Sequence, residues 1–429
     1  MDTYYAADPM LQSHRHPSLE GRREVRTCVI GGGFAGLNTA LGLVERGHDG
    51  VLLLEAGRIG HGASGRNGGF VFGGYSRDEA TLLADLGPVR ARELYAGTRE
   101  AVELIRRRIR QGAIECELSE SGVIWANWFR DPGPLRERQR LLADAYGVSW
   151  EWLSREEMAS LLRTRRYGEG LFERDAFHFH PLKYVHGLAR MAVERGACVH
   201  EASPAIGLQR RGAGWRVQTP GGSVEAETVV LACGGYLAGL VRHVDAAVLP
   251  ISTYVMTTAP LGDRLDEVMA TRAAVYDTRF AFDYYRPLAD TRLLWGGRIS
   301  IRERSPRAVR RLLYRDMLKV FPQLDGVEIE HAWSGRMSYA RHQMPQIGAI
   351  GEGLWLAQAF GGHGVAPSTH AGDLLASAIA EGDTRWRRFD GYGLVSAMKP
   401  LGFAAAQSSY WWAMARDGWK AWREGRATA

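Results

Sequence analysis

The chain has 429 residues, of which 45% are hydrophobic and 24% are charged, and its net charge is +6. This length predicts more than one domain, and the composition is that of an ordinary globular protein. The basic side chains are spread along the chain instead of being gathered in one patch, which argues against a nucleic-acid partner. The N-terminus is polar and no apolar stretch is long enough for a bilayer, so we expect neither an exported nor an integral membrane protein.

The four cysteines form no C-x-x-C pair, and three of them, Cys28, Cys198 and Cys233, stand in apolar runs typical of strands. We therefore expect buried, reduced thiols, no metal site and a cytoplasmic location.

Residues 1–25 are polar and predict an irregular N-terminal arm, and a βαβ unit follows. The apolar run 27–30 predicts a strand, 37–46 a helix and 51–54 a second strand, which ends at Glu55. The turn after the first strand carries three glycines in G-x-G-x-x-G spacing: Gly31, Gly33 and Gly36.

Each part of this unit suits a dinucleotide. Gly31 allows the tight turn, Gly33 lets the backbone approach a pyrophosphate, and Gly36 lets the helix pack against the strand. The helix N-terminus stabilises the phosphate charge. Glu55 stands 19 residues after Gly36, where a carboxylate can accept a hydrogen bond from a ribose hydroxyl. The unit alone does not distinguish FAD from NAD.

A second glycine-rich segment, 61–69, follows directly. Its four glycines, with Ser64, Arg66 and Asn67, exclude a regular helix or strand and predict a backbone that passes close to a ligand. An NAD-dependent dehydrogenase does not need such a loop after its acidic residue, whereas a larger flavin dinucleotide does. The segment therefore favours FAD.

The rest of the chain alternates helices and strands. Helical periodicity predicts helices at 79–110, 134–146, 155–162, 182–195, 306–320 and 368–381. Short strands are predicted at 114–118, 122–125, 177–180, 198–201, 215–218, 224–232, 327–333 and 353–360. Long strands of an antiparallel sheet rich in Tyr and Phe are predicted at 251–259, 281–286 and 293–298.

Glycines follow two of the apolar strands, at 234–235 and 361–364, so we expect the chain to return twice more to the cofactor sheet. Residues 391–429 predict an apolar, Trp-rich helical segment with basic residues. Packing over the body of the protein is the favoured interpretation, and a membrane surface is the alternative.

Four motifs together resemble the FAD-dependent D-amino-acid-oxidase-like superfamily, and within it the gamma-glutamylputrescine oxidase-like flavoproteins. They are the Gly31–Gly36 turn with Glu55, the segment 62–69, the segment 230–236 with Cys233 where relatives have Thr, and the segment 361–365. The likeness extends over nearly the whole chain.

The resemblance implies an α/β fold with a split Rossmann-type FAD-binding domain and an α+β substrate domain with an antiparallel sheet. This is a glutathione-reductase/D-amino-acid-oxidase-like architecture. The FAD-binding domain is expected at 26–78, 165–240 and 338–390, the substrate domain at 79–164 and 241–337, and a C-terminal helical segment at 391–429.

The expected FAD-binding residues come from the four motifs and their flanks. They are Gly31, Gly33, Phe34, Ala35, Gly36, Glu55, Ala56, Arg58, Ala63, Ser64, Arg66, Asn67, Gly68, Gly69, Ala205, Ala232, Cys233, Gly234, Gly361, Gly362, Gly364 and Val365.

The implied reaction is oxidation of an amine or amino acid to an imine that water hydrolyses, with O2 reduced to hydrogen peroxide. His363 and Tyr285 are the catalytic candidates. A protonated His363 would add positive charge beside the reduced flavin, whereas the alternative is a histidine that only fixes its turn. Tyr254, Tyr284, Arg298 and Arg336 are the substrate-binding candidates, and strand alternation lets only about half of the sheet's tyrosines face the flavin.

Two other functions stay open at this point. One is a dehydrogenase or N-demethylase that passes electrons to a carrier or quinone, and the other is a flavin- or NAD-binding protein without catalysis. The sequence leaves open which amine is the substrate, whether the flavin is covalently attached, and the oligomeric state.

Overall fold

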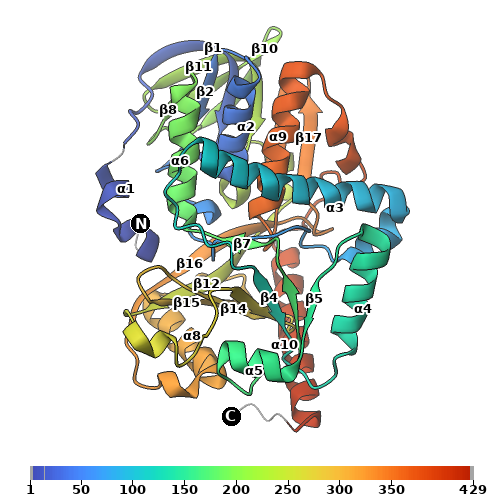
Figure 1. The fold of residues 1–429 in the computed structure, drawn as a ribbon. Helices are drawn as coiled ribbons and strands as arrows, with labels where there is room; N and C mark the ends of the chain where they lie inside the picture. Colours follow the sequence, from blue (N-terminus) through green and yellow to red (C-terminus); the bar gives the residue numbers. More distant parts are fainter. Residues whose placement is uncertain (1–2, 14, 426–429) are drawn as a thin grey trace.

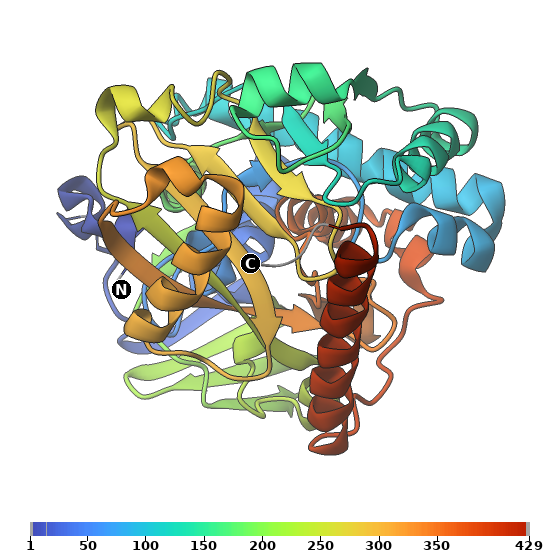
Figure 2. The same cartoon turned by 90° about the horizontal axis from the view of Figure 1, so that it is seen from below.

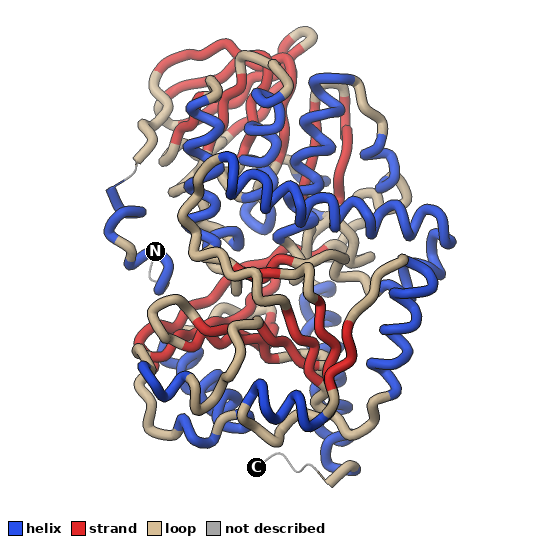
Figure 3. The backbone as a smooth tube through the Cα atoms, in the orientation of Figure 1, coloured by secondary structure: helices blue, strands red, loops and turns tan. Residues whose placement is uncertain are grey.

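The structure is a computed structural model that describes residues 3–13 and 15–425. Figure 1 shows two parts, one above the other, and the tube in Figure 3 shows that each contains its own group of strands with helices outside it. The fold class is α/β, as predicted.

The upper part is built on an eight-stranded sheet with the order β17-β18-β11-β1-β2-β8, from which β10 and β9 extend beside β11. β1 pairs in parallel with β11 and with β2, and the pairs β11–β18 and β2–β8 are also parallel. β2 is buried throughout, as expected for a parallel strand covered on both faces. The strands are β1 (Gly21–Ile30), β2 (Val51–Leu54), β8 (Cys198–His200), β9 (Gly207–Arg211), β10 (Gly214–Thr219), β11 (Gly222–Leu231), β17 (Gln346–Gly351) and β18 (Leu354–Gln358).

The lower part is built on a second eight-stranded sheet with the order β16-β12-β15-β14-β13-β4-β6-β5. All of its pairs are antiparallel except β13–β4. The strands are β4 (Val123–Ala126), β5 (Glu151–Leu153), β6 (Gly170–Glu173), β12 (Leu249–Thr258), β13 (Ala274–Asp277), β14 (Asp283–Pro287), β15 (Leu293–Ser300) and β16 (Ile329–Tyr339). A short pair, β3 (Phe70–Val71) with β7 (Phe177–His178), lies between the two sheets.

The α-helices of the described chain are α1 (Pro9–Ser13), α2 (Phe34–Glu45), α3 (Glu79–Gln111), α4 (Gly133–Leu141), α5 (Arg155–Leu162), α6 (Pro181–Glu194), α7 (Arg242–Ala246), α8 (Pro306–Val320), α9 (Val365–Glu381) and α10 (Leu401–Arg423). α2 packs against α6 and α9 on the upper sheet, and α3 crosses α9 (Figure 1). α8 packs against β12, β15 and β16. No helix of the described ranges combines the length and the apolar character that crossing a membrane requires.

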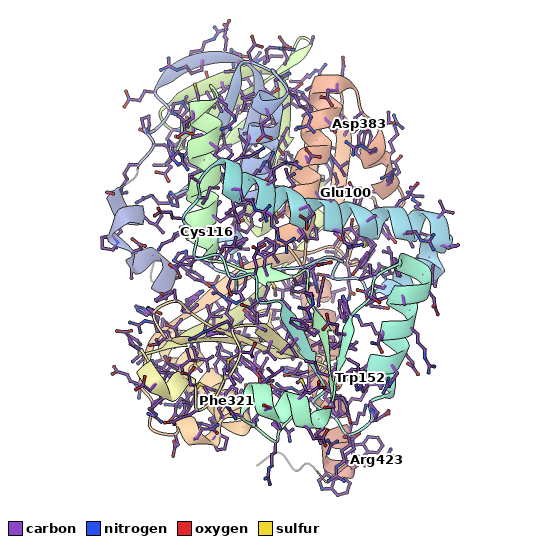
Figure 4. The ribbon with its side chains drawn as sticks, in the orientation of Figure 1. Glu100, Cys116, Trp152, Phe321, Asp383 and Arg423 are labelled. Atoms are coloured by element: carbon purple, nitrogen blue, oxygen red, sulfur yellow. The ribbon has the colours of Figure 1, made fainter. Side chains whose placement is uncertain are left out.

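The described residues form two large hydrophobic cores, and the first extends from the upper sheet to the lower sheet, where it includes Val255 and Leu294. The upper core joins α2, α3, α6 and α9 to the parallel strands, and the lower core joins α8 to β12, β14 and β15. In Figure 4, Cys116 lies in the upper half beside α6, whereas Phe321 lies in the lower half. Phe321 is fully buried in the lower core.

The structure corrects several sequence-based expectations. β1 begins at Gly21, within the expected arm, because its N-terminal half pairs with β11 from Gly21↔Gly222 onward. The strand predicted at 114–118 is absent, since Ala113 and Glu117 take left-handed conformations that turn the chain. Residues 391–400 precede the last helix, which begins only at Leu401.

The structure also bears on the thiols and the domain boundaries. Cys28 and Cys116 are buried, as expected, whereas Cys198 is exposed and Cys233 is only partly buried, contrary to expectation. β6, which falls in the range 165–240 expected to belong to the FAD-binding domain, pairs in the lower sheet. The division of the chain into an FAD-binding and a substrate domain stays a prediction.

Candidate functional site

The carboxyl ends of four parallel strands, β1, β2, β11 and β18, meet at one edge of the upper sheet. The Gly31 N–H donates to the Leu54 carbonyl at 2.8 Å, and the Ala232 N–H donates to the Ile30 carbonyl at 2.8 Å. A cavity of about 1880 Å³ begins at these ends and reaches the lower sheet. Ligand pockets typically measure about 300–1,000 Å³, so this cavity has room for a dinucleotide and a small substrate together.

The glycine turn after β1 leaves no room for side chains. A Cβ on Gly31 would lie 2.4 Å from the Ala232 carbonyl oxygen, and one on Gly36 would lie 1.9 Å from the Gly31 carbonyl oxygen. A Cβ on Gly33 would approach the Ser64 hydroxyl to 2.8 Å. α2 begins at the next residue, and its first residues, Phe34 and Ala35, line the cavity. The Phe34 N–H donates to the Ser64 hydroxyl at 2.9 Å. A helix N-terminus beside a glycine turn fits a pyrophosphate.

Glu55 connects the ends of β1 and β2. Its carboxylate accepts hydrogen bonds from the N–H groups of Gly32 at 2.7 Å and Gly57 at 2.8 Å, and the residue lines the cavity. Burial raises the pKa of Glu55, while the two N–H groups oppose that shift. The carboxylate is therefore held beside the glycine turn, where a ribose hydroxyl can reach it.

The second glycine-rich segment is a compact loop fixed by Asn67. Its side-chain amide donates to the carbonyls of Ala63 at 3.0 Å and Ser64 at 2.9 Å, and its oxygen accepts from the Gly69 N–H at 2.8 Å. A residue that is not part of the loop also holds it, since the Arg286 guanidinium donates to the Gly68 carbonyl at 2.6 Å. The loop is thus held in one shape before a ligand binds.

Most of the predicted FAD-binding residues line the cavity, but Gly36, Arg58 and Gly69 do not. Gly36 and Gly69 act by close packing, since a Cβ on Gly69 would lie 2.1 Å from the Phe179 carbonyl oxygen. Arg58 instead donates to the Leu11 carbonyl at 3.1 Å, which does not support its assignment to FAD, and that assignment stays a prediction. The residues that line the cavity are Gly31, Gly33, Phe34, Ala35, Glu55, Ala56, Ala63, Ser64, Arg66, Asn67, Gly68, Ala205, Ala232, Cys233, Gly234, Gly361, Gly362, Gly364 and Val365.

Toward the lower sheet the cavity is lined by aromatic rings, which we call the aromatic chamber. Phe72 stacks in parallel on Tyr276 at 5.6 Å between ring centroids, and Tyr276 stacks on Trp125 at 6.3 Å. The other rings of the chamber are Phe70, Phe282 and Tyr284. Sequence reasoning identified Tyr284 but missed Phe70 and Phe72, although both follow the second glycine loop directly and alternate as a strand would require.

The tyrosines of β12 and β14 divide between the chamber and the core. Tyr284 lines the cavity, whereas Tyr285 is fully buried and stacks on Trp295 at 4.4 Å. The Tyr254 hydroxyl donates to the Arg302 carbonyl at 2.6 Å on the same core side. The predictions of a catalytic Tyr285 and a substrate-binding Tyr254 are therefore wrong, because strand alternation turns both rings away from the cavity.

His363 lies in the loop before α9 and lines the cavity. Its ring meets Phe72 edge-on at 4.4 Å, and its backbone N–H donates to the Ser76 hydroxyl at 3.3 Å. Burial, helped by Arg138, lowers the pKa of His363 to about 4. The imidazole is thus neutral at pH 7, which does not support the alternative in which a protonated ring adds positive charge. The catalytic role of His363 stays a prediction. Positive potential in this loop comes from the N-terminus of α9, which begins at Val365.

The two arginines predicted to bind substrate both line the cavity, but their guanidinium groups differ in whether they are available to a substrate carboxylate. Arg298 uses Nε and Nη2 to hold the two carboxylate oxygens of Asp316, each at 2.7 Å, so its fork is occupied. This does not support Arg298 as a ligand for a substrate carboxylate. Arg336 pairs with Glu303 at 2.9 Å at a half-exposed position, and its substrate role stays a prediction.

A buried ion pair at one end of the chamber was not foreseen. Arg138 of α4 donates to the Glu79 carboxylate at 2.8 Å, and its guanidinium lies 4.6 Å from the Trp125 ring centroid. Both residues line the cavity. In the sequence, Glu79 resembles an ordinary first-turn helix residue and Arg138 a solvated one, so no local signal marked them.

Comparisons with known proteins agree with this geometry. The profile of the FAD dependent oxidoreductase family (DAO) matches residues 26–378. The gamma-glutamylputrescine oxidoreductase of Escherichia coli is 34% identical over 395 residues, which cover 91% of each chain.

Two solved structures share the fold. Glycine oxidase from Geobacillus kaustophilus superposes with a TM-score of 0.74 at 20% identity, covering 87% of this chain and 99% of that one. L-proline dehydrogenase from P. horikoshii superposes with a TM-score of 0.72 at 20% identity, covering 88% and 100%. The chain belongs to the DAO family of FAD-dependent oxidoreductases.

Proposed function

We propose that this enzyme oxidises the C–N bond of a gamma-glutamylated or related small amine to an imine, and that O2 takes the electrons and leaves as hydrogen peroxide. Water then hydrolyses the imine to an aldehyde or oxo product. At the coarser level, the chain is an FAD-dependent oxidoreductase of an amine or amino acid. The observation that carries the proposal is the single cavity that runs from the FAD-binding strand ends into the aromatic chamber.

Bound FAD would supply the hydride acceptor for the carbon next to the substrate nitrogen. In this chain the Gly31–Gly36 turn and the α2 N-terminus would hold the pyrophosphate, and Glu55 would hold the ribose. The Gly361–Val365 loop would contact the redox-active end. There, the N-terminus of α9, which begins at Val365, would stabilise negative charge on the bound group.

The chamber prepares the amine for oxidation. An amine gives up hydride only when its nitrogen is unprotonated, and removal from water lowers the pKa of an ammonium group. The rings of Phe72, Tyr276 and Trp125 supply such a surface. The neutral His363 can accept a hydrogen bond from the amine without the repulsion that an imidazolium would exert.

A second candidate is a dehydrogenase that passes electrons to a carrier. The observation in its favour is the exposed, Trp-rich α10, which offers a surface for such an acceptor. The chemistry at the amine would be the same, and only the electron acceptor would differ.

The test is an aerobic screen for hydrogen peroxide over polyamines, gamma-glutamylated amines, N-methyl amino acids and D-amino acids. We expect peroxide in proportion to substrate consumed, with the gamma-glutamylated amines reacting best. An anaerobic arm follows bleaching of the flavin band near about 450 nm, a property of the cofactor. Bleaching by a substrate that yields no peroxide in air, together with reduction of an added dye, would replace the oxidase by the carrier-linked dehydrogenase.

A further inference from the structure

The C-terminal helix α10 lies on the outside of the molecule, as Figure 2 shows. Four tryptophans on this helix are exposed: Trp411 by 63%, Trp412 by 65%, Trp419 by 57% and Trp422 by 68%. We propose that this face of α10, the tryptophan face, docks the enzyme onto the surface of an anionic lipid bilayer.

The spacing of the tryptophans places them together. Trp411 and Trp422 are three helical turns apart, and Trp412 and Trp419 are two turns apart, so all four project from one side. Toward the N-terminus, the exposed Ala404 continues the same side. A continuous strip of exposed rings of this kind is unusual for a protein surrounded only by water.

The opposite side fixes the helix in this orientation. Asp417 accepts a hydrogen bond from the Phe280 N–H at 2.7 Å, and Glu424 accepts one from the Arg130 N–H at 2.7 Å. The Lys420 ammonium lies 4.3 Å from the Phe129 ring centroid, and Ala413 and Ala421 are buried. Because these contacts join α10 to the lower part of the protein, the helix cannot roll its tryptophans inward.

The same contacts divide the charges of α10. Its acidic side chain, Asp417, and the capping Glu424 both face the protein, where backbone N–H groups bind them. Arg416 and Arg423 are exposed and lie against the tryptophans, at 5.3 Å from the Trp412 ring and 4.7 Å from the Trp419 ring. Arg416 also pairs with the Asp417 carboxylate at 3.8 Å, but the Asp417 side chain is only 13% exposed, whereas that of Arg416 is 55% exposed. The outer side therefore combines indole rings with charges that are mainly positive.

This combination matches a bilayer surface better than a second copy of the chain. Indole rings favour the level of the lipid headgroups, where the ring is buried and its N–H stays hydrated. Arginines beside them attract anionic lipids. In a pair of α10 helices, by contrast, the Arg416 and Arg423 side chains of both copies would be brought together, with only the largely buried Asp417 carboxylate beside Arg416.

Docking would also bring the active site near the membrane. The N-terminal half of α10 lines the cavity with Leu401, Gly402, Ala405 and Tyr410, whereas the tryptophans lie mainly in its C-terminal half. One helix thus connects the wall of the cavity to the proposed lipid-binding surface.

The test is cosedimentation of the FAD-loaded enzyme with phosphatidylcholine vesicles, with and without phosphatidylglycerol. We expect binding that requires phosphatidylglycerol and weakens as salt is added. The triple variant Trp411→Ser, Trp412→Ser, Trp422→Ser should lose at least about tenfold in apparent affinity, since buried apolar area drives insertion. Arg416→Gln with Arg423→Gln should lose about thirtyfold, since each basic residue near an anionic surface contributes about fivefold.

Matched control substitutions are available on α3, where Val89 is 72% exposed and Arg107 is also exposed. Val89→Ser with Arg107→Gln should bind vesicles as the unaltered enzyme does. Flavin content and melting temperature show that each variant is folded, and the arginine pair tests the proposal if the tryptophan variant does not fold. Absence of vesicle binding, or unchanged binding in both sets of α10 variants, overturns the proposal. So does a dimer that forms through the tryptophan face and binds no vesicles.

Discussion

His178 accepts a hydrogen bond through Nδ1 from the Arg286 guanidinium, at 3.3 Å, in the interior between the two sheets. Its Nε2 is 2.8 Å from the Arg272 carbonyl oxygen, to which it can only donate. The ring is therefore a neutral tautomer with one acceptor and one donor nitrogen. Because Arg286 also braces the Gly68 carbonyl of the second glycine loop, the charge state of His178 bears on the cofactor site.

The first prediction concerns acid stability. Burial, with Arg286 adding to it, lowers the pKa of His178 to about 3, and burial with Lys183 does the same for His180. Between pH 6.5 and 3 the unfolded chain binds protons that the folded chain does not, so the free energy of unfolding falls as pH falls below about 6.5. At pH 5, each histidine should lower the free energy of unfolding by about 2 kcal/mol. Thermal unfolding across this pH range will measure the decrease.

His180→Asn isolates one of these residues. His180 caps α6 by accepting the Lys183 N–H at 3.1 Å, and asparagine is also a good cap but does not titrate. Between pH 7 and pH 5, the free energy of unfolding of the variant should fall by about 2 kcal/mol less than that of the unaltered protein. His243→Asn, at an exposed position, is the control. Equal pH slopes in all three proteins would contradict the assignment of a depressed pKa to His180.

Local patterns in the sequence were enough to predict most of the residues that line the cavity at the strand ends of the upper sheet. Backbone conformation and spacing define the Gly31–Gly36 turn, Glu55 and the second glycine loop. Both can be predicted from short stretches of the sequence. The substrate half depends on which face of a strand meets the cavity and on pairs from distant elements. Tyr284 and Tyr285 are neighbours with opposite environments, and only the register and the packing of α8 decide which ring is core.

The elements of the fold also divide into those that a local sequence signal predicts and those that it does not. Helices such as α5 carry their own start signal, since Ser154 and Glu157 form a capping box. The short strands β5 and β6 were missed because neither has the continuous apolar run that marks β2, which is no longer than β6. Arg286 and Arg298 could not be interpreted from sequence, because their partners at Gly68 and Asp316 are far away along the chain.

The second prediction is steric. Gly36→Ala places a methyl group 1.9 Å from the Gly31 carbonyl oxygen, so the turn must open. We expect a loss of about 3 kcal/mol or more in stability, the upper end for overpacking, and at least about tenfold weaker FAD binding. Gly418→Ala in α10 is the matched control, since its Cβ meets nothing within 4 Å and alanine favours a helix. A Gly36→Ala protein that retains FAD as the control does would show that the turn is not the pyrophosphate site.

The third prediction separates the neighbouring tyrosines. Tyr285→Ala should cost about 3–5 kcal/mol of stability by emptying the space against Trp295, while kcat/KM per FAD-loaded molecule stays the same. Tyr284→Ala should lower kcat/KM by about tenfold or more, because it opens the chamber to water. Thermal unfolding and steady-state kinetics of both variants check this. A selective loss of kcat in a folded Tyr285→Phe protein would restore Tyr285 as a catalytic residue.

The fourth prediction concerns the acid at the end of β2. In Glu55→Gln the amide group must turn its NH2 toward one of two N–H groups, Gly32 or Gly57, which both donate to the carboxylate at present. The variant also loses the charge that a ribose hydroxyl would meet. Hydrogen bonds to a charged group are worth about 1.5–3 kcal/mol, so the Kd for FAD should rise about tenfold to a hundredfold. Glu24→Gln, on the exposed half of β1, is the control.

Equilibrium titration of the apoprotein with FAD measures this difference, and kcat at saturating FAD should stay the same because Glu55 lies at the strand ends and not among the rings of the chamber. A changed kcat with an unchanged Kd would place Glu55 in the chemistry instead of the cofactor site. An unchanged Kd and kcat would mean that Glu55 binds only the two backbone N–H groups and does not contact FAD.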